Sequence, residues 1–144
     1  MMDINILDFL RNANNLNGVH LNDSVDKVFE LRGDPLEIIG DKACGFLHYG
    51  NGIRFGYFGT EIDELAIIFY GGKSITYIVD CEHIRIINEK STINEILLFL
   101  NFSNIEWKSN DEKNVNVFSV KLNNNIYILF DLLTGRLTKI SISR

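Results

Sequence analysis

The 144-residue sequence contains one proline and two cysteines, and it has no long apolar run. A secreted disulfide-stabilised domain of this size usually has more cysteines at closer spacing, so we expect Cys44 and Cys81 to be reduced thiols in the cytosol. No basic segment followed by an apolar one begins the chain, and no apolar stretch approaches the roughly 20 residues that span a bilayer. We therefore expect a cytoplasmic protein without a membrane partner.

The sequence also lacks a Pro- or Ser-rich linker and any low-complexity tract. We therefore predict a single domain over residues 1–144, which is long enough to bury a sizeable core without disulfides or metals. Hydrophobic residues make up 46% of the chain and charged residues 23%, as is typical of a folded protein. The formal charge of −5 disfavours direct binding to nucleic acid and favours a basic protein partner.

Two segments carry matching helix start and stop signals. Ser24 is placed as the N-cap of a short amphipathic helix that Gly33 ends. Thr92 and Glu95 form a capping-box pattern ahead of a second apolar segment, and Asn101 stands where a left-handed residue can end it. The starts and the stops are both 68 residues apart. This recurrence predicts an internal repeat.

Runs rich in β-branched and aromatic residues follow each predicted helix. Three follow the first helix, at 46–49, 53–58 and 65–70, and three follow the second, at 115–122, 126–130 and 137–142. Further strands are expected at 75–80 and 84–87, joining the halves, and a short helix is expected around Ile4, Leu7 and Leu10. We predict an α+β fold of two tandem α-β-β-β units, about residues 20–74 and 88–144. The helices are expected to pack on one face of a shared antiparallel sheet.

A resemblance to a known family supports this fold. The segment from Leu21 to Pro35 contains a capped helix that ends in the pattern Leu-x-Gly-x-Pro. Tyr49, Gly52-Ile53, Phe55 and Leu65-x-Ile67 continue the pattern. The chain in this way resembles domains similar to β-lactamase inhibitor protein, a tandem-repeat fold with helices on a continuous antiparallel sheet. It departs from that inhibitor in lacking an export signal and the expected disulfides, which puts a secreted target in doubt.

The chain also resembles the immunity proteins of bacterial contact-dependent inhibition and other polymorphic toxin systems, which are small, acidic, cytosolic α+β proteins. The two resemblances imply a non-enzymatic inhibitor that covers a cognate toxin domain and occludes its active site. The negative charge favours a basic domain, for which a nuclease is one candidate. On this interpretation the protein has no catalytic residues, no cofactor and no metal.

Seven residues are candidates for the partner-binding surface. They are carboxylates that can meet Lys and Arg of a partner, and tyrosines that offer a large contact area at low entropic cost. The set is Tyr57, Glu61, Asp63, Glu64, Tyr77, Asp80 and Glu82. The two tyrosines are assigned outward-facing positions on their strands. The alternative is a solvated loop for the acids and a core position for the tyrosines.

Two other functions remain open. Cys44, His48, Cys81 and His83 can supply four zinc ligands or a Cys-His nucleophilic pair, although neither spacing is that of a standard module. The alternative is therefore a small metal- or ligand-binding module or an enzyme.

The segment Gly71-Gly72-Lys73-Ser74 lacks the upstream glycine and downstream helix of a phosphate loop, so we expect a hairpin or loop there and no nucleotide site. A ligand sensor or an oligomerisation module with an exposed sheet edge is a further possibility.

Overall fold

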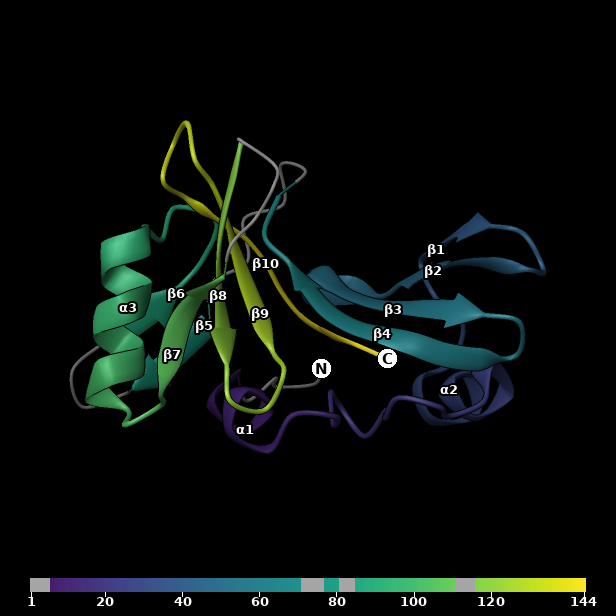
Figure 1. Ribbon diagram of the computed structural model, residues 1–144. Helices are drawn as coiled ribbons and strands as arrows, with labels where there is room; N and C mark the ends of the chain where they lie inside the picture. Colours follow the sequence, from purple (N-terminus) through teal and green to yellow (C-terminus); the bar gives the residue numbers. More distant parts are fainter. Residues whose placement is uncertain (1–5, 71–76, 81–84, 111–115) are drawn as a thin grey trace.

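The computed structural model describes residues 6–70, 77–80, 85–110 and 116–144 (Figure 1). Three helices are present in this part of the chain: α1 (Ile6–Asn12), α2 (Val25–Arg32) and α3 (Ile93–Phe102). Figure 1 places α2 and α3 at opposite ends of the molecule. The predicted α+β class is confirmed.

Eight strands form one antiparallel sheet. The strands are β1 (Glu37–Gly40), β2 (Cys44–His48), β3 (Ile53–Phe58), β4 (Glu61–Ile68), β7 (Trp107–Asn110), β8 (Val117–Leu122), β9 (Tyr127–Asp131) and β10 (Leu137–Ser143). Their spatial order is β1-β2-β3-β4-β10-β9-β8-β7, so the last strand of the chain pairs with β4 at the centre. The central register aligns Leu65 with Ile142 and Ile67 with Ile140.

The two strands expected at 75–80 and 84–87 are present as β5 (Tyr77–Asp80) and β6 (Arg85–Ile87), and they pair with each other in a separate two-stranded sheet. The edge strands β1 and β7 were not expected at all. Both are only four residues long, and β7 has the polar sequence Trp-Lys-Ser-Asn, so neither shows the alternation that identifies a half-buried strand.

The predicted helix starts are confirmed. The Ser24 hydroxyl accepts the Lys27 N–H at 3.1 Å. The Thr92 hydroxyl accepts the Glu95 N–H at 3.3 Å and lies 3.1 Å from the Glu95 carboxylate. A side-chain cap of this kind satisfies a helix N–H that has no intrahelical partner.

One predicted helix end is right and the other is wrong. Gly33 follows α2 with a φ of 74°, and its N–H bonds the Phe29 carbonyl at 2.8 Å. Asn101, in contrast, lies inside α3, and it is Asn104 that takes a left-handed φ of 57°. The Asn101 side chain has another role, because its oxygen accepts the Trp107 indole N–H at 2.9 Å.

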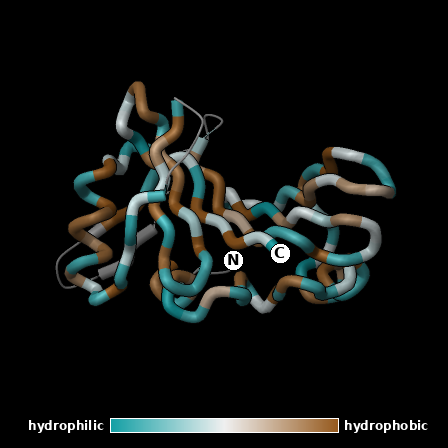
Figure 2. The backbone as a smooth tube through the Cα atoms, viewed as in Figure 1, coloured by the Kyte–Doolittle hydropathy of each residue, from teal (hydrophilic) through white to brown (hydrophobic). Residues whose placement is uncertain are grey.

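Side chains from all three helices join the sheet in one connected hydrophobic cluster. Alternation along the strands supplies it, as at Ile126, Ile128 and Phe130, each fully buried. Figure 2 shows hydrophobic and hydrophilic residues alternating along the central strands. Full burial of one such aliphatic or aromatic side chain stabilises the fold by about 1.5 to 3 kcal/mol.

Candidate functional site

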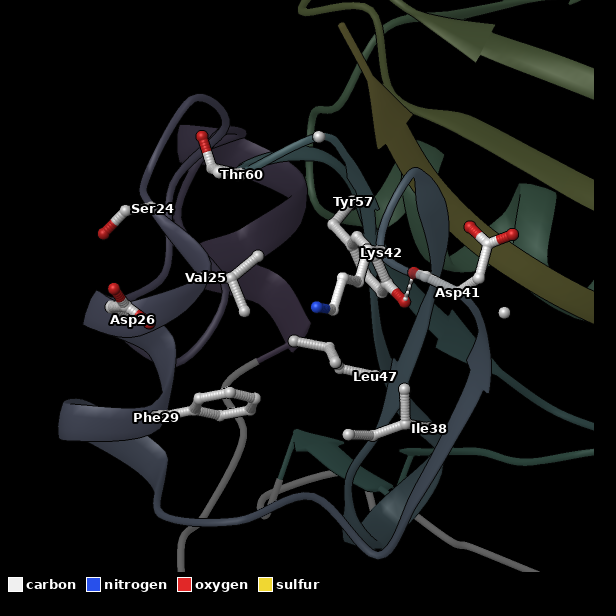
Figure 3. Close-up of a pocket in the computed structure, with 12 residues that line it drawn as sticks. Ser24, Val25, Asp26, Phe29, Ile38, Asp41, Lys42, Leu47, Tyr57 and Thr60 are labelled. Carbon is white, nitrogen blue, oxygen red and sulfur yellow. Dashed lines mark hydrogen bonds between the residues drawn. The ribbon is translucent and has the colours of Figure 1, made fainter.

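A cavity of about 520 Å³ opens between the start of α2, the β1–β2 hairpin and the β3–β4 turn (Figure 3). Its wall is mainly apolar. Val25 and Phe29 contribute from the helix, Ile38 and Leu47 from the hairpin, and Tyr57 from β3. The remaining lining residues are Ser24, Asp26, Gly40, Asp41, Lys42, Gly59 and Thr60. A cavity of this size and lining is typical of a binding site.

Backbone hydrogen bonds fix the helix side of the cavity to β4. The Val25 N–H bonds the Thr60 carbonyl at 2.9 Å, and Ser24 bridges Glu61 in an antiparallel contact. The Ile62 N–H bonds the Asp23 carbonyl at 2.8 Å. These bonds join the first residues of α2 to the first residues of β4, so they hold this wall of the cavity against the sheet.

The hairpin side is held by close backbone contacts. The Tyr57 hydroxyl donates to the Asp41 carbonyl at 2.6 Å, the bond drawn in Figure 3. Gly40 has a φ of 117°, and a Cβ there would lie 2.4 Å from the Cys44 carbonyl oxygen. The Gly59 N–H bonds the Ala43 carbonyl at 2.6 Å. The turn of the hairpin is therefore joined to the neighbouring β3–β4 turn on the sheet side of the cavity.

The segment that forms the cavity contains more acidic than basic side chains. Residues 20–74 contain nine acidic and five basic side chains, whereas residues 88–144 contain six acidic and seven basic ones. Asp26, Glu30 and Glu37 are exposed, and none forms an ion pair within the described residues. Lys42 is the nearby cation, and Figure 3 shows its side chain reaching into the cavity. Of the acidic side chains, Asp26 and Asp41 line the cavity itself, and Glu30 and Glu37 lie on the elements that form its walls.

The β1 strand exposes apolar residues at the edge of the sheet. All four of its residues are exposed, including Ile38 at 53% and Ile39 at 48%, and Leu36 just before it is 73% exposed. Within the described part of the sheet, β1 has β2 as its only neighbour. Its outer row of N–H and C=O groups is therefore free to pair with another chain.

The assignment of Tyr57 to an outward position is wrong. Its side chain is 7% exposed and shares a face with Ile53 and Phe55, because residues two apart on a strand point the same way. Phe58 is the exposed aromatic of this strand, at 63%. Tyr57 nevertheless lines the cavity.

The three acids of β4 have different environments. Glu61 is exposed and lies 3.4 Å from the Arg144 guanidinium, and Asp63 is half-buried. Glu64 is the carboxylate at the centre of an internal network, 2.6 Å from Arg54 and 2.9 Å from Lys139. Its two oxygens are occupied within the chain, so the expected role of Glu64 in meeting a basic partner does not fit its environment.

Burial and ion pairing act in opposite directions on the pKa of Glu64. Burial raises it, but the hydrogen bonds and charges of Lys139 and Arg54 outweigh burial and leave the pKa below its ordinary value. Asp23 behaves similarly, because the His20 N–H and the Lys27 ammonium overcome the effect of burial and lower its pKa. Both carboxylates stay ionised at neutral pH as parts of the folded framework.

The remaining candidates are only partly described. Tyr77 and Asp80 lie at the two ends of β5, while Glu82, Cys81 and His83 lie outside the described residues. Cys44 is exposed on β2, and His48, at the other end of that strand, stacks edge-on against Phe46. Within the described residues, no three His, Cys, Asp or Glu side chains are grouped to hold a metal.

The sequence reasoning missed the cavity itself. Phe29 was expected only as a helix residue, Leu47 only as a strand residue, and Ile38 in neither, because the contact between α2 and the hairpin depends on β1, which was not predicted. The only available signal was the pair of isoleucines after Pro35, bounded by Gly40. A run that short does not identify a strand.

Comparison of the chain with protein-family models, with curated proteins and with solved structures finds no match. None of the described helices combines the length and the apolar character that a membrane crossing requires.

Proposed function

We propose that this protein is a binding protein of the immunity type, which neutralises a basic toxin domain by covering it. One observation carries the proposal: the acidic segment 20–74 contains an apolar cavity, with Asp26 and Asp41 in its lining, beside an exposed apolar sheet edge. Buried apolar anchors supply affinity at protein interfaces, and surrounding charges supply fast association and specificity. A nuclease domain suits this surface because it must itself be basic to bind nucleic acid.

We further interpret the fold as two tandem units, each with a helix and the strands that follow it. The N-caps Ser24 and Thr92 each form an isolated bridge, to Glu61 and Arg136 respectively, at the entry to β4 and β10. Those two strands then pair with each other at the centre of the sheet. Each unit would have four strands, one more than the sequence predicted. The helices would cover one face of the sheet, and residues 1–144 would form a single domain.

A contact within the first unit supports its likeness to the inhibitor family. The Tyr49 hydroxyl donates to the Gly33 carbonyl at 2.8 Å, so two residues of the sequence pattern meet in space. Burial and the nearby Asp34 carboxylate raise the pKa of this phenol. Tyr49 therefore acts as a neutral hydrogen-bond donor that ties the end of α2 to the sheet.

The test is co-expression of the full chain in the cytoplasm with each candidate toxin domain encoded by the neighbouring genes, read by growth and by co-purification. We expect one-to-one capture and restored growth. The triple variant Asp26→Lys, Glu30→Lys, Glu37→Lys should slow association at low salt by ten-fold or more, whereas Glu106→Lys in the other half should change it by less than about two-fold. Failure to capture the domain or restore growth would overturn the proposal. If both variants slowed association equally, the surface formed by Asp26, Glu30 and Glu37 would not be the binding surface.

A further inference from the structure

Building on the proposed function, we infer that the partner supplies an extended segment that pairs with the free edge of β1. This segment inserts an apolar side chain, with a basic residue beside it, into the cavity between α2 and the β1–β2 hairpin. The two features are adjacent, because Ile38 and Gly40 of β1 also line the cavity. The edge and the cavity would therefore act as one site.

The edge of β1 is less protected than the opposite edge of the sheet. Proteins guard exposed edges with lysine, proline, bulges or short strands. β7 carries Lys108 and polar neighbours, whereas β1 itself has no lysine or proline and exposes Ile38 and Ile39. The pairing of β1 with β2 is regular over its four residues, without the bulge that appears between β3 and β4. β1 is as short as β7, so the difference between the two edges is the apolar character of β1, which can accept another short strand.

Strand geometry directs the added segment toward the cavity. Alternate side chains of paired strands lie side by side on the same face of a sheet. Ile38 and its partner Leu47 both face the cavity, so every second residue of a strand paired with β1 would project on that face. Val25 and Phe29 form the opposing wall. An apolar side chain from the added strand would enter between these walls.

Charge determines which partner fits. Asp26 and Glu30 lie on the exposed surface of α2, and Glu37 begins β1. A second copy of this chain would bring the same negative surface against itself, which is unfavourable, whereas a basic segment would be attracted. Lys42 indicates how a basic side chain of the partner would lie in the cavity, because Figure 3 shows its aliphatic stem among the apolar residues there. Because Lys42 is exposed, an incoming lysine or arginine can displace it.

Two adjacent isoleucines give a matched pair of variants for the test. Ile38→Lys places a charge on the cavity face of β1, and Ile39→Lys places the same charge on the opposite face of the same strand. Both positions are about half exposed, so both variants should fold, which thermal unfolding checks. We expect Ile38→Lys to weaken binding of the co-purified toxin domain by ten-fold or more and Ile39→Lys by less than about three-fold.

Hydrogen exchange on the wild-type complex supplies the second measurement. Pairing of a strand with β1 should slow amide exchange in residues 36–41, together with residues 24–29 around the cavity, and leave 107–110 unchanged. If the domain is captured but protection falls elsewhere and both variants bind normally, the strand-pairing inference is overturned while the immunity function stands. Failure to capture the domain overturns both. Strong weakening by Ile39→Lys as well would show that the opposite sheet face is used.

Discussion

The two halves of the molecule share an order of elements but use their helices differently. In residues 88–144, α3 buries Ile96, Phe99 and Leu100, and the half has a net charge of +1. In residues 20–74, α2 buries only Val28, and the half has a net charge of −4. α3 therefore buries more apolar residues than α2, although it also exposes Leu98 and Phe102. α2 instead places Val25 and Phe29 at the wall of an open cavity.

The two halves should differ most in how much folding stability they lose when one aromatic side chain is removed. Phe130 is fully buried at the centre of the cluster, so Phe130→Ala should lower the free energy of unfolding by about 3 to 5 kcal/mol. Phe29 is half-buried against the cavity, and Phe29→Ala should cost about 1 kcal/mol. Urea unfolding of both variants provides the comparison. Equal losses would show that the cavity wall is an ordinary part of the core.

The ion-pair network at the junction of the halves should give the next largest effect. Glu64→Gln removes the charge that pairs with Arg54 and Lys139, both largely buried, and should cost about 2 to 3 kcal/mol at pH 7. The exposed Glu30→Gln, with no ion pair within the described residues, is the control and should change stability by less than about 0.5 kcal/mol.

The pH dependence of stability tests whether the charge of Glu64 is the cause of this loss. The pKa of Glu64 is lower in the folded protein than its ordinary value of 4.5. Its stabilising contribution is therefore complete above that value and is lost as the pH falls through the folded-state pKa. The deficit of Glu64→Gln relative to wild type should shrink as the pH falls below 4.5, in urea titrations at each pH. A deficit that stays constant would mean that packing, and not charge, is what the substitution removes.

The sequence predicted those elements whose signals are local. Ser24, Gly33 and Thr92 mark helix boundaries by side-chain hydrogen bonding and backbone conformation, and each was found in its expected role. Strand β3 was predicted with its exact bounds, since Ile53 to Phe58 is bounded by glycine-containing turns. The central strand β4 begins earlier than expected because its first turn pairs with the entry of α2.

The candidate site was less predictable because it depends on contacts distant in sequence. Glu64 looked like a surface acid, and only the fold brings Lys139 to it across 75 residues. The burial of Tyr57 could have been predicted from the sequence, because Tyr57 alternates with Ile53 and Phe55 along the strand. The cavity required β1, whose exposed residues Ile38 and Ile39 show no alternation of burial.

Removing the N-caps of α2 and α3 should give smaller losses of stability that are similar in the two halves. Thr92→Ala and Ser24→Ala should each cost about 1 kcal/mol, since each leaves a helix N–H without its side-chain partner. Thr92→Ala should be the larger of the two because Thr92 also contacts the Glu95 carboxylate. Thermal unfolding of the alanine variants, with Thr92→Ser as the control that keeps the hydroxyl, measures the difference. A larger loss for Ser24→Ala would mean that the cavity wall depends on its cap more than the packed half does.

The smallest expected effect is at the exposed edge. Ile38→Thr keeps a β-branched side chain that suits a strand, and Ile38 is already more than half exposed, so the free energy of unfolding should change by less than about 0.5 kcal/mol. Ile140→Thr, at a fully buried position of β10, should cost several times more. Urea unfolding of the two threonine variants measures the contrast. If Ile38→Thr were as costly as Ile140→Thr, the apolar residues of β1 would be retained for folding, and their exposure would no longer argue for a binding surface.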